Sequence, residues 1–425
     1  MDHLFSYLCI AASAFIVTYI TVPFAKRFAA KVGAIDYPSA RRINTKPIPR
    51  MGGIAIFLGL CTAVIVQYFG SHYLNWQPAL IPHPRMSIDY PLLGLSVLVI
   101  FGTGFLDDIF TLRARVKLAG QIAGALIACF SGLVITEVVN PFVTGGEIEL
   151  GLLAWPLTVF YLISFTNIIN LIDGLDGLAC GITCISSFAL CSFAMLSGQS
   201  DATVILLSLA ACCLAFLRYN FHPASIFLGD SGSLLLGFLL GVASLLNVSR
   251  TAAVTAMLMP IIVAGVPVLD TLSAIIRRSR AGVSVGVADK GHIHHRLIKE
   301  GFDQRQAVLF IYAWCAVLSL GAALINQVQV GYRFLIVFLL AIASFAVAHK
   351  LHLFEPVLRH HYNPATKQDE LISPDDDHFE EETAADKIVV NELLNGNLDI
   401  IHDKMSGRLQ GLQPSDSQKA DKNQK

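Results

Sequence analysis

Residues 167–179 interrupt two apolar segments with amides and carboxylates at every third position: Asn167, Asn170, Asp173 and Asp176. The two amides share a helix face, because residues three apart are neighbours there. A glycine follows each aspartate, so that backbone or ligand can come close. Unpaired carboxylates are costly in apolar surroundings. A bound divalent metal that carries a phosphorylated substrate would satisfy the cluster, and an acidic turn between two helices is the alternative.

A second acidic pair, Asp107 and Asp108, ends another apolar segment. Adjacent carboxylates repel, and near lipid they need a metal or basic partners. Thr111 and Leu112 stand where a prenyl-chain synthase would carry its second acid. We predict a metal site here, with a hydrated helix terminus as the alternative. Lys117 is a candidate for binding a lipid phosphate, or else snorkels to the interface.

Asp230 begins a third acidic group, Asp-Ser-Gly-Ser, which follows Asn220 and precedes an apolar segment. Taken alone, Asp230 reads as a helix N-cap. Three acidic groups on one side of the membrane instead favour a common metal site.

Histidines and one buried acid form a further group. His292 and His295 are three residues apart, with His294 offset from them. Histidine can ligate a metal or hydrogen-bond phosphate and sugar groups. A zinc site is the alternative, but no cysteine supports it. Asp270 lies inside an apolar segment and needs a partner, so pairing with a neighbouring base and catalysis both remain open.

The loop over residues 36–53 is basic, with Arg41, Arg42, Lys46 and Arg50. Such side chains bind phosphate oxygens, and Arg does so in a fork. The general excess of positive charge on cytoplasmic loops is the alternative explanation. Several prolines and a terminal glycine pair indicate a shaped loop.

The elements that must position these residues are membrane helices. The chain is 54% hydrophobic and 14% charged, far below the roughly 25% charged content of soluble domains. About 20 apolar residues cross a bilayer as a helix. We therefore predict an all-α, polytopic transmembrane bundle of about eleven spans, near 3–25, 52–70, 91–107, 116–136, 152–168, 178–197, 201–219, 231–247, 252–276, 306–325 and 331–350.

Charge sets the orientation. Lys and Arg gather in alternate loops, whereas the opposite loops hold only Arg85, Arg250 and Arg333, which places the polar groups in cytoplasmic loops. The N-terminus has no basic region, and its apolar stretch runs into Lys26 and Arg27, which predicts a first span and no cleaved signal peptide. The nine cysteines lie in apolar segments without CxxC spacing and read as small buried hydrophobes.

Two regions follow from composition. Residues 1–350 are predicted to form the membrane domain, and residues 351–425 an acidic, largely disordered cytoplasmic tail. Residues 386–412 have the apolar spacing of a short amphipathic helix.

Together the motifs resemble those of the polyprenyl-phosphate N-acetylhexosamine-1-phosphate transferases, of the glycosyltransferase 4 type. They are Asp107-Asp108, residues 167–179, Phe227-Leu-Gly-Asp-Ser-Gly-Ser233 and His292-Ile-His-His-Arg296, in the family's order and spacing over roughly residues 1–350. The histidine motif and the first loop resemble the bacterial branch that transfers GlcNAc-1-phosphate, and not the branch that makes the first lipid intermediate of peptidoglycan. Asn44 is a departure, since relatives often carry His there.

The resemblance implies an enzyme of the bacterial inner membrane with its site facing the cytoplasm. It would transfer GlcNAc-1-phosphate from UDP-GlcNAc to undecaprenyl phosphate with Mg²⁺, or alternatively Mn²⁺, and release UMP in the first membrane step of a surface polysaccharide. It assigns catalysis to Asp107, Asp108, Asp173, Asp176 and Asp230, with metal binding at Asp107, Asp108, Asp173 and Asp230. It assigns substrate binding to Arg41, Arg42, Asn170, Asn220, His292, His294 and His295, and we expect Lys117, Asn167 and Arg296 to bind substrate as well.

The chemistry is consistent with these residue types. UDP-sugars do not cross a bilayer, so the donor arrives from the cytoplasm. Magnesium prefers hard oxygen ligands and leaves some positions for substrate phosphates. A phosphomonoester has its second pKa near 6, so positioning and charge neutralisation should matter more than a general base. This favours direct attack over a covalent aspartyl intermediate.

Other functions remain as alternatives. The same reaction could use another UDP-N-acetylhexosamine or UDP-MurNAc-pentapeptide. A transporter would also be polytopic, but its site would lie near the bilayer midplane between repeats. A scaffold anchored by the tail would leave the motifs unexplained. The expected partners are the two substrates and membrane lipids, with no nucleic acid, and a homodimer is left open.

Overall fold

A computed structural model describes residues 2–37, 46–81, 88–139, 147–248, 260–280, 291–325, 328–354, 359–363 and 368–372. The chain divides into two compact units. The first comprises residues 1–274 and 292–354, and the second comprises residues 275–291 and 355–425.

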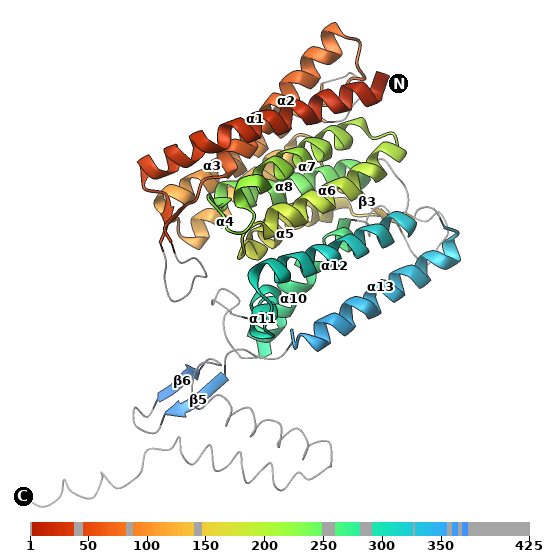
Figure 1. Cartoon of the computed structure of the whole chain (residues 1–425). Helices are drawn as coiled ribbons and strands as arrows, with labels where there is room; N and C mark the ends of the chain where they lie inside the picture. The colour runs from red at the N-terminus through yellow and green to blue at the C-terminus, as the bar shows by residue number, and fades with distance from the viewer. Residues whose placement is uncertain are drawn as a thin grey trace, which may run out of the picture. The chain divides into compact units, whose positions relative to one another are not determined.

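The first unit is a helical bundle (Figure 1). Its helices are α1 (Asp2–Val32), α2 (Gly53–Tyr73), α3 (Tyr90–Phe110), α4 (Ala114–Phe130), α5 (Ala154–Ile172), α6 (Leu178–Leu196), α7 (Ser200–Asn220), α8 (Gly229–Val248), α11 (Ile293–Lys299), α12 (Gln304–Ile325) and α13 (Val330–Lys350). Helix α10 (Gly265–Arg280) contains the boundary between the units. A 3₁₀ turn, η1 (Gly151–Leu153), precedes α5.

Short antiparallel hairpins accompany the helices. Strand β1 (Ile35–Asp36) pairs with β2 (Ile48–Pro49), and β3 (Glu137–Val139) pairs with β4 (Glu147–Glu149). In the second unit, β5 (Arg359–Asn363) pairs with β6 (Gln368–Ile372), so that Arg359 lies opposite Ile372. This hairpin falls in the segment predicted as the tail. The predicted amphipathic stretch at 386–412 lies outside the described residues.

The predicted polytopic helical fold is confirmed. Among the described residues, 9 helices are long and apolar enough to cross a membrane: α1, α2, α3, α5 with the turn before it, α6, α7, α8, α12 and α13. The predicted span at 116–136 corresponds to α4, which has 17 residues and ends at Phe130, before the turn that begins at Ser131. Much of the predicted span at 252–276 lies outside the described residues, so the number eleven stays a prediction.

Helix α8 forms the centre of the bundle. Of its most apolar stretch 89% is buried, compared with 11% for that of α13. It packs against α3, α5, α7 and α2. A helix that is apolar on every side belongs in a core, and the start of α8 therefore has a fixed place relative to its neighbours.

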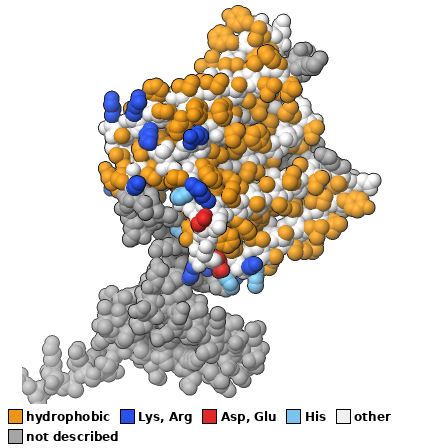
Figure 2. Space-filling view, viewed as in Figure 1, with side chains coloured by type: hydrophobic (Ala, Val, Ile, Leu, Met, Phe, Trp, Pro, Cys, Tyr) orange, Lys and Arg blue, Asp and Glu red, His pale blue; other side chains and the backbone are white. Residues whose placement is uncertain are grey.

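The outer surface is apolar where a bilayer would contact it. Figure 2 shows hydrophobic side chains covering the flanks of the helices, with Lys and Arg gathered towards one end. Phe334, Phe338 and Phe345 of α13 are exposed, as are Phe5 and Phe24 of α1. Exposed apolar surface of this extent marks a membrane contact. The chain is a multi-pass membrane protein.

Two glycines let α2 and α3 touch the first turn of α8. A Cβ added at Gly104 of α3 would meet the backbone of Asp230 and Ser231. A Cβ added at Gly53 of α2 would meet the backbone of Ser231 and Gly232. Backbone contacts of this kind cannot be relieved by a rotamer change, so both positions require glycine.

We expect Gly104→Ala to destabilise the bundle, because its methyl group would push α3 away from α8. Overpacking in a filled core costs about 1–3 kcal/mol. Gly102 lies on the same helix and has no atom near its added Cβ, which makes Gly102→Ala the matched control. Thermal unfolding in detergent measures the difference. Equal midpoints for the two variants would show that α3 and α8 do not touch as described.

Candidate functional site

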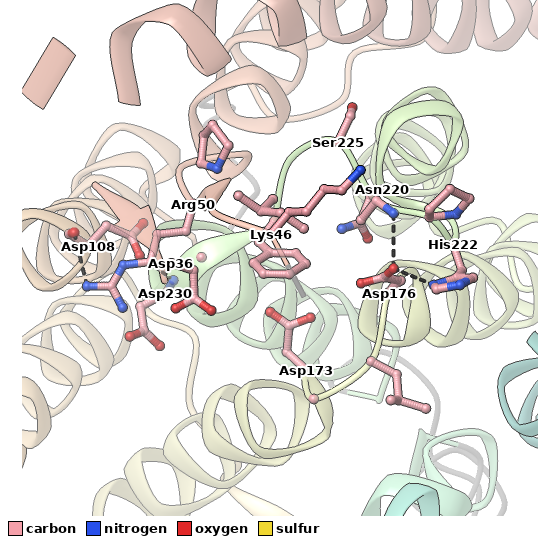
Figure 3. A pocket seen from close by; sticks show the side chains of 18 of the residues that line it. Asp36, Lys46, Arg50, Asp108, Asp173, Asp176, Asn220, His222, Ser225 and Asp230 are labelled. Atoms are coloured by element: carbon pink, nitrogen blue, oxygen red, sulfur yellow. Dashed lines mark hydrogen bonds and ion pairs between the residues drawn. The ribbon is translucent and has the colours of Figure 1, made fainter. Parts of the chain in front are cut away.

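The polar residues meet in a cavity of about 930 Å³ at the ends of the bundle helices. Figure 3 shows carboxylates from α3, from α8 and from the α5–α6 turn facing this space. The predicted site residues that line it are Asp108, Lys117, Asn170, Asp173, Asp176, Asn220, Asp230, His294 and His295. Segments distant in sequence therefore form one site.

Asp108 anchors the first turn of α8. Its Oδ1 accepts the backbone N–H of Asp230 at 2.8 Å, and its Oδ2 accepts that of Ser231 at 3.0 Å. The first N–H groups of a helix have no partner inside it, and a negative charge there also complements the helix dipole. Asp108 is 1% exposed. The N-cap role that the sequence offered for Asp230 is thus filled by Asp108 from a different helix.

Lys117 joins two further carboxylates. Its Nζ lies 2.6 Å from Asp230 Oδ1 and 3.6 Å from Asp107 Oδ2. Asn170 donates to the same Asp230 oxygen at 2.5 Å and to Ser233 Oγ at 2.7 Å. Asp230 therefore lies at the centre of a network that collects donors from α4 and α5.

Asp173 differs from the other carboxylates of the cavity in its hydrogen bonding. It caps the end of α5 and lines the cavity, and no donor among the described residues hydrogen-bonds to it. Burial, together with the charges of Asp230, Asp108 and Asp176, raises the pKa of Asp173 to about 8. A bound cation would stabilise its ionised form.

Asp176 pairs with a histidine that the sequence analysis did not select. Its Oδ2 lies 2.7 Å from His222 Nδ1 and also accepts the backbone N–H of Ala224 at 3.0 Å. His222 lines the cavity (Figure 3). Its position two residues after Asn220, which the sequence analysis did select, was the available signal.

The side chain of Asn220 hydrogen-bonds to two backbone groups. Its Oδ1 accepts the N–H of Gly177 at 3.1 Å, and its Nδ2 donates to the carbonyl of Ile226 at 3.0 Å. It thereby ties the turn between α5 and α6 to the loop that leads into α8. Gly177 directly precedes α6 and has a φ of 79°. Glycine adopts this left-handed conformation without the steric cost that a Cβ would bring.

The three histidines have different places. His294 and His295 line the cavity, whereas His292 does not and pairs with Asp270 at 2.8 Å. The ring of His294 lies against Gly174, where an added Cβ would meet Nε2 and Cε1. Burial, and to a lesser degree the neighbouring His295, lowers the pKa of His294 to about 3. At neutral pH this imidazole is uncharged.

The other predicted binding residues lie away from the cavity or outside the description. Asn167 pairs with Gln121 of α4, with Nδ2 2.6 Å from Gln121 Oε1. Arg296 follows the histidines on α11 and is not among the lining residues. Arg41 and Arg42 lie outside the described residues.

The first loop contributes residues that were named only for charge or not at all. Arg50 donates to the carbonyl of Asp108 at 3.2 Å, at the end of α3, where a cation complements the helix dipole. Asp36 and Lys46 of the loop line the cavity, as does Lys26 of α1. The loop also pairs with the segment before α8, since Phe227 donates its N–H to Pro49 at 2.8 Å. The predicted shaped loop is therefore part of the cavity wall.

The donor set suits a hard divalent cation. Among the described residues no three His, Cys, Asp or Glu side chains are gathered tightly enough to hold a metal alone. Mg²⁺ does not require this, because it is usually held by one or two carboxylates with substrate phosphates and water. Asp107 and Asp230 already share one cation, the Lys117 ammonium, and Asp173 has no partner within the described part of the chain. The residues fit the predicted metal.

Fold and cavity together describe a multi-pass membrane protein with a charged cavity at the ends of its helices, an arrangement suited to an enzyme that works on a polar substrate at the membrane surface. Residues 90–248 match the family model for glycosyl transferase family 4. This segment contains all five predicted catalytic aspartates.

Curated relatives extend the match beyond that segment. A probable undecaprenyl-phosphate N-acetylglucosaminyl 1-phosphate transferase of Bacillus subtilis (strain 168) is 38% identical over 333 residues, covering 77% of this chain and 88% of the relative. A decaprenyl-phosphate N-acetylglucosaminephosphotransferase of Mycobacterium tuberculosis (strain ATCC 25618 / H37Rv) is 38% identical over 338 residues, covering 74% and 81%. An undecaprenyl-phosphate alpha-N-acetylglucosaminyl 1-phosphate transferase of Escherichia coli (strain K12) is 29% identical over 315 residues, covering 72% and 80%.

The chain belongs to the polyprenyl-phosphate N-acetylglucosamine-1-phosphate transferases of glycosyl transferase family 4. The resemblance drawn from the motifs is confirmed at the level of the family. The relatives' names do not assign a role to any single residue, so the residue roles remain proposals.

Asp107→Asn and Asp108→Asn should differ, although the two residues are adjacent. Asp108→Asn removes one of two acceptors for α8 and leaves a buried N–H unpaired, which costs about 1–3 kcal/mol. We expect it to lower both thermal stability and turnover. Asp107→Asn should lower turnover and leave the unfolding midpoint near that of wild type. Reversed behaviour of the pair would contradict the anchoring role of Asp108.

Asp173 should make stability depend on pH. Its folded-state pKa of about 8 lies above the unfolded value of about 3.9, so the folded state binds the proton more tightly. Stability from this group is full below about pH 4 and is lost as pH rises towards 8. Asp173→Asn should flatten that fall in the unfolding midpoint, measured in metal-free detergent buffer. An unchanged slope in the variant would assign the pH dependence to other groups.

Proposed function

We propose that the protein transfers GlcNAc-1-phosphate from UDP-GlcNAc to undecaprenyl phosphate with Mg²⁺ and releases UMP. The reaction would occur at the cytoplasmic face of a bacterial inner membrane and begin a surface polysaccharide. The observation that carries the proposal is the Asp107–Lys117–Asp230 network with Asn170 at the wall of the cavity, in a chain whose relatives are named for this reaction type.

Lys117 is suited to the acceptor phosphate. It lies in the first turn of α4, close to the end of α3 and beside Asp107 and Asp230. An ammonium there attracts the phosphate dianion of a lipid whose chain stays in the bilayer. Held in place, this phosphate can attack the donor without a base of matched pKa, since orientation itself lowers the barrier.

Asp107, Asp173 and Asp230 are suited to hold the cation. When bound, Mg²⁺ would offset the charge on the donor diphosphate as the bond to UMP breaks. Asn170 keeps Asp230 in place through its hydrogen bond to Oδ1. Release of Lys117 from Asp230 would then leave the ammonium free for phosphate.

His294 and His295 are suited to the donor. They line the cavity, as does Lys46 of the first loop. A neutral His294 can donate one hydrogen bond and accept another, so it can bind sugar hydroxyls as well as phosphate oxygens. His222, held by Asp176, adds a third imidazole to the residues that line the cavity.

The names of the relatives divide over the lipid. The Bacillus subtilis and Escherichia coli relatives are named for undecaprenyl phosphate, and the mycobacterial relative for decaprenyl phosphate. All of them are named for N-acetylglucosamine. We therefore propose UDP-GlcNAc as donor and undecaprenyl phosphate as acceptor, with chain length as the less constrained choice.

Purified protein should label undecaprenyl phosphate from UDP-GlcNAc in the presence of Mg²⁺ and not in its absence. We expect other UDP-N-acetylhexosamines and UDP-MurNAc-pentapeptide to react more than tenfold more slowly. Asp230→Asn should lose more than a hundredfold in turnover, because the network loses its central charge. Asp201→Asn is the control, since Asp201 is a buried carboxylate whose Oδ1 accepts the backbone N–H of Leu80 at 2.9 Å and which does not line the cavity.

Well-folded wild type that labels lipid from none of these donors would contradict the proposal. Transfer that persists in EDTA would remove the metal from it. Movement of an intact donor across vesicles without UMP release would favour a transporter.

A further inference from the structure

Asp270 is a buried carboxylate that the proposed reaction does not use. It lies on α10 and is fully buried, with 0% exposure. Its Oδ2 lies 2.8 Å from Nδ1 of His292, and its Oδ1 accepts the backbone N–H of Ile293 at 2.7 Å. Both oxygens are thus directed to the start of α11. A buried ionised group is tolerated only with such partners.

His292 links Asp270 to the cavity without lining it. It precedes α11 and is 8% exposed. Its ring stacks on that of His294, with centroids 5.9 Å apart and an interplanar angle of 3°. His294 in turn faces Gly174, on the turn that carries Asp173. A chain of contacts therefore runs from Asp270 to the wall of the cavity.

The orientation of the His294 ring depends on its packing and not on a hydrogen bond at Nδ1. It is 3% exposed, and its Nδ1 is buried without a hydrogen-bond partner in the described part of the chain. Helix α11 has 7 residues and is too short to be stable without tertiary contacts. Its position must come from tertiary contacts, which are the core packing of Ile293 and Leu297 and the hydrogen bonds at its start.

We propose that Asp270 is the positioning residue of the histidine motif. It holds the start of α11 and fixes His292 with the proton on Nδ1, which sets the His294 and His295 rings against the cavity. The inference rests on the proposed function for its effect on turnover. The contact itself can be tested without that function.

The carboxylate selects one form of His292. A carboxylate oxygen only accepts hydrogen bonds, so Nδ1 must carry the proton. The hydrogen bond at one ring nitrogen decides which nitrogen is protonated. An Asn at position 270 offers one acceptor and one donor in place of two acceptors. Because the Ile293 N–H is fixed as a donor, the Asn amide would face His292 and favour protonation at Nε2.

The first arm of the test reads the proton on His292. Protein labelled with ¹⁵N-histidine is compared by NMR as wild type, Asp270→Asn and Asp201→Asn, with His292→Gln used to assign the signal. We expect an Nδ1-protonated His292 in wild type and in Asp201→Asn, and its loss in Asp270→Asn. An Nε2-protonated His292 in wild type would overturn the proposal, whether or not the enzyme is active.

The second arm is a double-mutant cycle on turnover. We expect Asp270→Asn and His292→Gln each to lower turnover at least tenfold, and the double variant to be no slower than the slower single variant. Coupled residues are non-additive in this way. Multiplied losses would overturn the proposal, because Asp270 would then act independently of His292. Unchanged turnover in Asp270→Asn would overturn it as well.

Folding is controlled in both arms. Each variant must give a single gel-filtration peak in detergent, and Asp270→Ser, which keeps an acceptor for Ile293, replaces Asp270→Asn if that variant aggregates. Wild type without transfer from any UDP-sugar would instead count against the proposed function, while the NMR arm would still decide the contact.

Discussion

The two hydrogen bonds from the first turn of α8 to Asp108 are the interaction on which the site depends. One carboxylate from α3 accepts two backbone N–H groups at the start of the most buried helix of the bundle. Those N–H groups would otherwise be unpaired in a dry environment. With the turn fixed, the side chain of Asp230 has one direction to take, towards Lys117 and Asn170.

The backbone around this turn is closely packed. Gly53 and Gly104 bring two helices into backbone contact with it, and the loop before it pairs with Pro49. Interiors packed at this density do not deform gradually. The result is a rigid charged wall made from α3, α8 and the first loop, on which a substrate can be positioned.

The carboxylates of the cavity are not each paired with a cation of their own. Lys117 is shared between Asp107 and Asp230, His294 is neutral, and Asp173 has a pKa of about 8 because nearby carboxylates add to the effect of its burial. Like charges gathered at one site are a feature of functional sites. A divalent cation would relieve the repulsion.

Much of this could be read from the sequence. Apolar length and charge gave the helical bundle, and the spacing of acidic groups gave the cavity and its family. The different roles of Asp107 and Asp108 could not be predicted, because they depend on what the fold brings to each: Lys117 lies beside Asp107, whereas the first turn of α8 hydrogen-bonds to Asp108. The same holds for His292, which turns inward to Asp270 while His294 lines the cavity. Such differences arise from the packing of segments far apart in the chain, which periodicity does not encode.

We propose that the anchored turn of α8 carries a cation site, and the electron paramagnetic resonance of Mn²⁺ titrated into the purified protein with UDP-GlcNAc present tests this directly. We expect one tightly bound Mn²⁺ per chain in wild type and in Asp201→Asn, and its loss in Asp230→Asn. Equal Mn²⁺ binding in Asp230→Asn would show that Asp230 does not hold the cation.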